Sequence, residues 1–148
     1  MKNYKICVVG AGRWGLNHVK TLEKLDSLGG VIDSNSSTLI EIKKEYPKCL
    51  IFENLEDSFK KNFDAYIVAT PPKSHFSIAK KIIYKRKPLL VEKPLTLSLN
   101  DAEYLNYISK KNNVNLMVGH LLLFHPAFLK IKQIIDNGKI GKIQYMYS

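Results

Sequence analysis

Cysteine and long apolar runs are what this sequence most clearly lacks. Cys7 and Cys49 are its only cysteines, and neither belongs to a Cys-x-x-Cys pair. A zinc site and a disulfide scaffold are therefore not predicted. No apolar stretch approaches the roughly 18 residues that a membrane helix requires, and the opening MKNYKICVVG is too short for a signal peptide. These absences favour a protein of the reducing cytoplasm without a membrane partner.

Acidic residues are also scarce, since 13 Asp and Glu stand against 23 Lys and Arg, for a formal net charge of +10. The lysines are nevertheless spread through every segment, mainly on the expected polar faces of helices. No basic stripe with interleaved aromatic side chains occurs, so nucleic-acid binding is not predicted. We interpret the charge as a solvated surface whose field attracts an anionic small substrate.

What the sequence does contain is a regular alternation of short apolar runs and amphipathic stretches. Strands are expected at 4–10, 28–33, 49–52, 64–70, 88–94 and 114–120. Helices are expected at 13–25, 36–47, 72–87, 98–113 and 125–141, and 54–63 forms either a short helix or a loop. This alternation predicts an α/β fold: a Rossmann-type, doubly wound parallel sheet with helices on both faces.

The end of the chain departs from this alternation. The last helix is expected to end near Asn137 and Gly138, where asparagine followed by glycine is a C-terminal cap signal. Residues 142–148 then alternate apolar and polar side chains as a strand does. We therefore expect residues 1–141 to form the Rossmann domain and residues 142–148 to be a strand that follows it.

A glycine-rich turn follows the first apolar run. Gly10, Gly12 and Gly15 fit the pattern G-x-G-x-x-G between a strand and a helix, and Asp33 follows the next strand at about the expected distance. In such a turn the glycines permit a tight bend and close approach of a pyrophosphate to the helix N-terminus. A glycine turn without a ligand and a methyltransferase are the alternatives, and the spacing of the third glycine favours a dinucleotide. The candidate cofactor residues here are Gly10, Gly12, Arg13, Trp14, Gly15, Asp33 and Ser34.

The residues after the second strand predict which dinucleotide binds. The carboxylate of Asp33 can accept hydrogen bonds from the adenosine ribose and would repel a 2′-phosphate. Its neighbours Ser34, Asn35 and Ser36 include no arginine to offset that charge. NAD is therefore predicted as the cofactor, with NADP less favoured.

The segment VATPPKSH, residues 68–75, follows the fourth predicted strand, at the sheet edge where such folds bind ligands. Thr70 and Pro71 are expected to form a stiff rim beside the cofactor. Pro72 is equally typical of a helix start. His75 is interpreted either as a helix cap or as a cofactor contact.

The segment VEKP, residues 91–94, ends the fifth predicted strand and carries a candidate catalytic group. An alcohol that loses a hydride must also lose a proton, so a cation or base beside the hydroxyl assists the reaction. Lys93 supplies that group. Glu92 either orients Lys93 through a side-chain contact or only holds the strand end, and a cis Lys93–Pro94 bond is a further hypothesis.

Five segments together resemble the N-terminal half of the Gfo/Idh/MocA oxidoreductases: VVGAGRWGLNHVKTL, VIDSN, VATPPKSHFSIA, LLVEKPLTLSLNDAEYL and LMVGHLLLFHPAFLKIKQIIDNGKIGKIQYMYS. The resemblance implies hydride transfer between NAD(P) and a carbon of a sugar or cyclitol, and the last segment is most similar to members that act on UDP-N-acetyl sugars. It implies that Lys93 contacts the reacting hydroxyl. It also implies that the cofactor cleft is lined by His18, Thr70, Pro71, His75 and Glu92.

The remaining histidines carry weaker signals. His120 ends the sixth predicted strand, and it is either a buried structural residue or a substrate contact near the mouth of the site. His125 precedes Pro126 and is interpreted as a helix-start residue. No two histidines have the spacing of metal ligands, so no metal is expected.

The resemblance also implies a second, α/β sheet domain with an antiparallel sheet, of which residues 142–148 would be the first strand. In the family this domain carries a histidine and an acidic residue for proton transfer, the substrate pocket and most oligomer contacts. We therefore expect this chain to bind NAD without turning over substrate alone, and the complete protein to be a homo-oligomer. A non-catalytic NAD-binding sensor is the alternative, against which Lys93 argues because sensing requires no group beside a hydroxyl.

Overall fold

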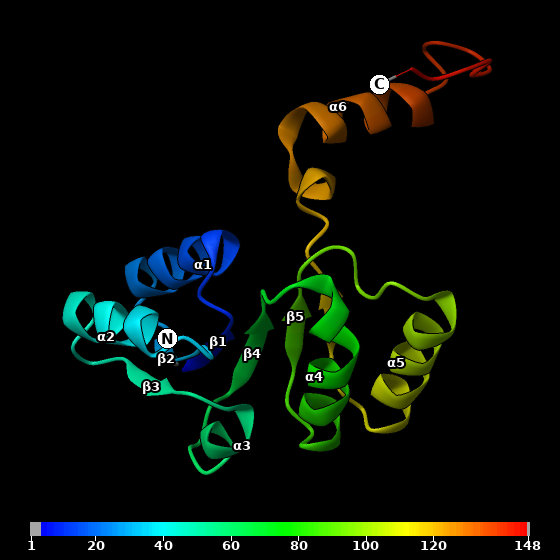
Figure 1. The fold of residues 1–148 in the computed structure, drawn as a ribbon. Coiled ribbons are helices and arrows are strands. Elements are labelled where there is room, and N and C mark those ends of the chain that lie inside the picture. Colours follow the sequence, from blue (N-terminus) through cyan, green and yellow to red (C-terminus); the bar gives the residue numbers. More distant parts are fainter. Residues whose placement is uncertain (1–3, 148) are drawn as a thin grey trace.

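The apolar runs pair into a single sheet of short strands. The computed structural model describes residues 4–147, and the strands lie in the order β3–β2–β1–β4–β5–β6 (Figure 1). All neighbouring strands are parallel. Their bounds are β1 (Ile6–Val9), β2 (Leu28–Ile32), β3 (Leu50–Phe52), β4 (Ala65–Val68), β5 (Leu89–Val91) and β6 (Leu116–Val118). Each strand is shorter than predicted, because the predicted ranges include flanking residues that lie outside the paired part of the sheet.

Helices cover both faces of this sheet, as the sequence predicted (Figure 1). One face carries α1 (Arg13–Lys24) and α2 (Ser36–Glu45), and the other carries α4 (Pro72–Tyr84) and α5 (Leu99–Lys111). The predicted Rossmann-type fold is therefore confirmed.

The core consists of two layers because consecutive strand residues point to opposite faces. Val8 of β1 is buried in one cluster with Val19 of α1, whereas the adjacent Cys7 is buried in the other cluster with Ile82 of α4 and Leu105 of α5. The 3.6-residue spacing of apolar side chains in the helices supplies both layers. The packed sheet thus holds the residues at the carboxyl ends of its strands in fixed positions.

The strand order reverses between β1 and β4. The chain moves outward from β1 to β3 and then returns to place β4 on the other side of β1. In open parallel sheets, ligands bind outside the carboxyl ends of the strands at such a reversal. Residues that follow β1, β2, β4 and β5 therefore meet at one edge.

Residues 54–63 begin with a single-turn helix, α3 (Leu55–Ser58), and continue as turns, so the short-helix alternative is observed. The side chain of Asn54 caps this helix by accepting the Asp57 N–H at 2.9 Å. Cys7 and Cys49 are buried free thiols. Within residues 4–147, no helix is long and apolar enough to cross a membrane.

Beyond β6 the chain leaves the sheet. A 3₁₀ turn that was not predicted, η1 (Leu121–Phe124), leads into α6 (Pro126–Asp136), which projects away from the sheet (Figure 1). No residue of α6 is buried, and the helix ends at Asn137 as predicted. His125 is its N-cap, and the ring accepts the Ala127 N–H at 3.2 Å, so the helix-start interpretation is confirmed.

The strand predicted for 142–148 is wrong over the residues that the structure describes. Residues 142–147 form no strand, and Ser148 lies outside the described residues. Alternating side chains favour an extended backbone, but a strand also requires hydrogen bonds to a neighbouring strand. No strand within residues 4–147 pairs with this segment.

Candidate functional site

Two clefts open at the carboxyl edge of the sheet. The first, called the β2 cleft here, has a volume of about 540 Å³ and is lined by residues including Gly10, Gly12, Asp33, Ser34, Glu53, Thr70, Pro71 and Ser74. The second, called the β5 cleft, has a volume of about 620 Å³ and is lined by Trp14, Glu92, Lys93, Pro94, Gly119, His120 and Leu121–Leu123. Gly12 of the glycine-rich turn lines the first cleft and Trp14, two residues later at the start of α1, lines the second, so the predicted site residues are divided between two adjoining spaces.

The three glycines of the turn have different physical roles. Gly10 has φ +90°, a conformation that side chains disfavour. A Cβ on Gly15 would lie 1.8 Å from the carbonyl oxygen of Gly10, so Gly15 permits the helix to start against the turn. A Cβ on Gly12 would meet no atom within 4 Å. Gly12 therefore faces open space, which is where a ligand can approach the backbone.

The N-terminus of α1 suits an anionic ligand. Its N-cap is Gly12, which offers no side-chain hydrogen bond, and its first turn contains no acidic residue. The first N–H groups of a helix lack partners within the helix and carry a partial positive charge. By contrast, the side chain of Asn35 caps the N-terminus of α2. The residues of the turn therefore fit a pyrophosphate.

The carboxylate of Asp33 accepts hydrogen bonds from the backbone around it. Its Oδ2 accepts the Ala11 N–H at 2.7 Å, and its Oδ1 accepts the Asn35 N–H at 2.9 Å. The carboxylate thus braces the glycine-rich turn from the end of β2 while lining the β2 cleft. Sequence spacing predicted its position but not this bracing contact.

The end of β4 forms one wall of the β2 cleft. Thr70 and Pro71 line it, as the sequence predicted, and Ser74 Oγ donates to Thr70 Oγ1 at 2.8 Å. A Cβ on Gly10 would lie 2.9 Å from Thr70 N and Cγ2, so this wall packs directly against the glycine-rich turn. Pro72 is the first residue of α4, as its helix-start interpretation required.

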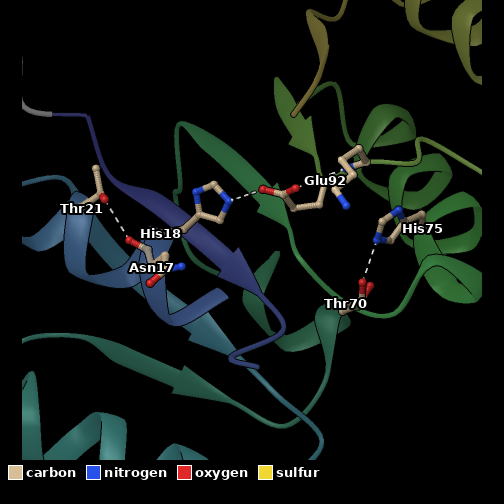
Figure 2. A network of polar contacts seen from close by, with 7 residues as sticks. Asn17, His18, Thr21, Thr70, His75 and Glu92 are labelled. Carbon is tan, nitrogen blue, oxygen red and sulfur yellow. Dashed lines mark hydrogen bonds and ion pairs between the residues drawn. The ribbon is translucent and has the colours of Figure 1, made fainter. Parts of the chain in front are cut away.

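His75 is buried next to Thr70 and does not line the β2 cleft (Figure 2). Its ring is 1% exposed, with Nε2 at 2.7 Å from the Thr70 carbonyl oxygen and Nδ1 at 2.8 Å from that of Pro94. A neutral ring donates to one of these carbonyls, and only a doubly protonated ring donates to both. The helix-cap interpretation is wrong, because α4 has no side-chain cap. The ring instead links the segments that follow β4 and β5.

Glu92 is a buried carboxylate at the end of β5 (Figure 2). Its Oε1 lies 2.8 Å from His18 Nε2 of α1, and its Oε2 accepts the Lys93 backbone N–H at 3.3 Å. A Cβ on Gly119 would lie 3.1 Å from Oε2, so the carboxylate is also confined from the β6 side. Of the two interpretations, the contacts match the one in which Glu92 holds the strand end, because the hydrogen bond reaches the backbone of Lys93.

Lys93, Trp14 and His120 are exposed side chains that share the β5 cleft. The interpretation of His120 as a buried structural residue is wrong, because the chain turns outward into η1 directly after it. The Lys93–Pro94 peptide bond is cis, as hypothesised. Arg13 is exposed on the first turn of α1 and is not among the described residues that line either cleft.

Metal ligands are not gathered at this edge. Among the residues 4–147 that the structure describes, no group of three His, Cys, Asp or Glu side chains is placed to hold a metal ion. The polar side chains that line the two clefts are instead carboxylates, hydroxyls, one side-chain amide, one indole, one lysine and one histidine. Such groups suit a dinucleotide that lies across the glycine-rich turn.

Residues 4–120 match the sequence model of the Gfo/Idh/MocA proteins, described as an oxidoreductase family with an NAD-binding Rossmann fold. The chain belongs to this family. The resemblance noted from the sequence is therefore confirmed, and so is NAD as the cofactor.

Several characterised proteins share this family's fold with the chain. A UDP-N-acetylglucosamine 3-dehydrogenase from Acidithiobacillus ferrooxidans is 29% identical over 85% of this chain and 40% of that protein. A scyllo-inositol 2-dehydrogenase (NAD(+)) from Bacillus subtilis is 34% identical over 95% of this chain and 42% of that protein. The crystal structure of scyllo-inositol dehydrogenase from Lactobacillus casei, with NAD(H) and scyllo-inositol bound, aligns with a TM-score of 0.90 at 26% identity, over 96% of this chain and 43% of that chain. The chain thus spans less than half the length of these relatives.

The sequence reasoning did not single out Glu53, and it did not anticipate the contact that His18 makes. Glu53 lines the β2 cleft but was not singled out, although its position directly after a short apolar run is the same signal that identified Asp33. His18 was assigned to the cleft by the resemblance alone. Nothing in the local sequence indicates its contact with Glu92, because the two residues are 74 positions apart.

Proposed function

We propose that the protein is an NAD-dependent oxidoreductase that transfers a hydride between the nicotinamide and a hydroxyl-bearing carbon of a sugar, cyclitol or nucleotide sugar. The observation that carries the proposal is the placement of Lys93. Its exposed side chain lies in the β5 cleft, and this cleft adjoins the glycine-rich turn through Trp14. A mobile cation at the expected nicotinamide end of an NAD-binding cleft is suited to contact a reacting hydroxyl.

In this proposal the bound cofactor extends through both clefts. In this proposal the N–H groups at the start of α1 hold the pyrophosphate, Gly12 leaves room for it, and Asp33 accepts hydrogen bonds from the adenosine ribose. Thr70 and Pro71 form the wall beside it, with His75 supporting that wall from behind. When bound, NAD supplies the acceptor or donor of the hydride.

The residues of β5 position the reacting group of the substrate. Lys93 would stabilise the negative charge that develops on the hydroxyl oxygen as its proton leaves. Glu92 fixes the backbone from which Lys93 extends, through the 3.3 Å contact with its N–H. His120, in the same cleft, is proposed as a further substrate contact.

The proposed substrate class is based on the substrates named for the relatives. One acts on UDP-N-acetylglucosamine and another on scyllo-inositol, and both are polyhydroxylated rings with secondary alcohols. The positive net charge of this chain favours an anionic substrate among them, such as a nucleotide sugar.

We also propose that a second domain completes the enzyme. This is supported by α6 and η1, which carry several exposed apolar side chains; Leu123, Phe124 and Phe128, for example, are 47–64% exposed. Large exposed apolar patches mark interaction surfaces. The complete protein is proposed to be a cytoplasmic homo-oligomer, with the residues beyond 141 belonging to the second domain.

Two measurements test the proposal. Titration of the 148-residue chain with NADH, followed by fluorescence of its single tryptophan, Trp14, should give saturable binding. The chain and any longer product of the same gene should then be assayed for NAD reduction with UDP-N-acetylglucosamine and with inositols. Turnover by the longer product alone is expected. Binding without turnover by any form would favour the sensor alternative, and turnover by the 148-residue chain would contradict the need for a second domain.

A further inference from the structure

The β2 cleft contains a second carboxylate beside Asp33. Ile32 of β2 pairs with Phe52 of β3, and the Asp33 N–H donates to the Phe52 carbonyl oxygen at 3.1 Å. Asp33 and Glu53 therefore follow directly from paired positions on adjacent parallel strands at one edge of the sheet (Figure 1). Both side chains line the same cleft.

The two carboxylates are not equivalent. Both oxygens of Asp33 accept backbone N–H groups, so its charge also serves to hold the glycine-rich turn. Glu53 has one hydrogen bond within residues 4–147, from Ser36 Oγ to its Oε1 at 3.0 Å. Glu53 is exposed, and no backbone group holds its carboxylate. Its removal should therefore change the charge of the cleft without disturbing the turn.

No basic side chain in the lining of this cleft offsets the two charges. Among the described residues that line it, there is no lysine, arginine or histidine. The N-terminus of α2, which lies next to Asp33 in the chain, would be the natural place for an anion. However, Asn35 Oδ1 already accepts the Ser37 N–H at 3.0 Å and the Ser37 hydroxyl at 2.6 Å. A phosphate here would be repelled by the carboxylates, and the N-terminus of α2 is already capped by Asn35.

We propose that Glu53 acts with Asp33 as a second specificity-determining residue that excludes the 2′-phosphate of NADP. The inference rests on the proposed binding of a nicotinamide dinucleotide in the two clefts. A 2′-phosphate carries about −1.5 to −2 charges near neutral pH, whereas the ribose hydroxyl of NAD carries none. Glu53 therefore acts mainly on NADP, by repulsion, and its effect decreases as salt screens the charges.

The experiment compares NADH and NADPH binding to the 148-residue chain and its variants by titration of Trp14 fluorescence. Glu53→Gln keeps the size of the side chain and removes its charge. NADPH affinity should rise about two- to fivefold, as expected for a partly exposed charge interaction, while NADH affinity stays constant. The gain should shrink at high ionic strength. Glu41→Gln is the matched control, because Glu41 is exposed on α2, carries the same charge and lies outside the cleft, and it should change neither affinity.

Other outcomes overturn the inference. A parallel fall in affinity for NADH and NADPH would mean that Glu53 contacts the part common to both, such as the adenine. An equal gain from Glu41→Gln would mean that only net charge matters, and no gain from Glu53→Gln would place the selection on Asp33 alone. If the wild-type chain binds NADH and Glu53→Gln changes neither affinity, this inference fails but the proposed function stands. If the wild-type chain binds neither NADH nor NADPH, both proposals are refuted.

Discussion

His18 Nε2 of α1 lies 2.8 Å from Glu92 Oε1 at the end of β5. The His18 side chain is 19% exposed and that of Glu92 is 8% exposed, so the contact is largely shielded from water. It joins the helix that follows the glycine-rich turn to the segment directly after β5, in which Lys93 follows Glu92 (Figure 2). The relative position of the two clefts therefore depends on a side-chain pair as well as on the sheet.

A double-mutant cycle on His18 and Glu92 should measure this connection. Alanine at either position leaves the other polar group shielded from water without its hydrogen-bond partner. This loss of stability should be larger than the loss on breaking an exposed pair. We expect a coupling free energy of about 1 kcal/mol or more, from urea unfolding of the chain, the two single variants and the double variant.

The exposed pair Glu56 and Lys81 is the control for this cycle. Its atoms are 2.6 Å apart, but the side chains are 59% and 56% exposed. Solvent screening should limit its coupling to about 0.5 kcal/mol or less. Equal coupling energies for the two pairs would show that shielding of the His18–Glu92 contact contributes nothing.

Alanine substitutions should separate a glycine needed for binding from a glycine needed for folding. At Gly12 a Cβ meets no atom within 4 Å and φ is −69°, so Gly12→Ala should change the free energy of unfolding by only about 0.5 kcal/mol. Because the methyl group would stand where the pyrophosphate approaches, NADH affinity should fall by about tenfold or more, or about 1.4 kcal/mol.

Gly15→Ala should show the opposite pattern. Its Cβ would lie 1.8 Å from the Gly10 carbonyl oxygen, and a backbone atom cannot move aside without shifting the turn. We expect a loss of about 3 kcal/mol in urea unfolding. A stable Gly15→Ala chain with normal NADH affinity, or a Gly12→Ala chain with normal affinity, would contradict the assigned roles.

Lys93→Ala, made in the longer product of the same gene, tests the proposed chemistry. The side chain is exposed in the β5 cleft and no described contact depends on its ammonium group, so folding and NADH affinity should be retained. Loss of the group beside the hydroxyl should lower kcat by about 100-fold or more. Lys44→Ala, at an exposed position of α2 away from both clefts, should leave kcat unchanged, and full activity of Lys93→Ala would remove Lys93 from the mechanism.

The two cysteines should be unreactive while the chain is folded. Burial raises the pKa of Cys49 to about 11 and that of Cys7 well above its ordinary value. Only the thiolate attacks an alkylating reagent, so at about pH 8 its fraction at Cys49 should be roughly two orders of magnitude lower than for a free thiol. Labelling followed by mass spectrometry should be slow in buffer and fast in urea. Rapid labelling of the folded chain would contradict this burial.

Local sequence determined most of the fold. Apolar runs such as those around Val8 and Ile67 are long enough for buried parallel strands, and the helical spacing of Val19 and Leu22 places one face on the sheet. Residues 142–147 were an exception, because alternation alone cannot supply the neighbouring strand that a strand requires.

The sequence by itself also determined the chemistry available at the site. The spacing of Gly10, Gly12 and Gly15, the acidic Asp33 after the next strand and the lysine of the VEKP segment are local patterns, and each was visible without coordinates. Only the tertiary structure decided which groups meet. His18 reaches Glu92, His75 is enclosed between two carbonyl groups, and Glu53 stands beside Asp33. These contacts join residues far apart in the chain, and they arise because parallel strands bring their carboxyl ends to one edge, in a register that the whole sheet sets.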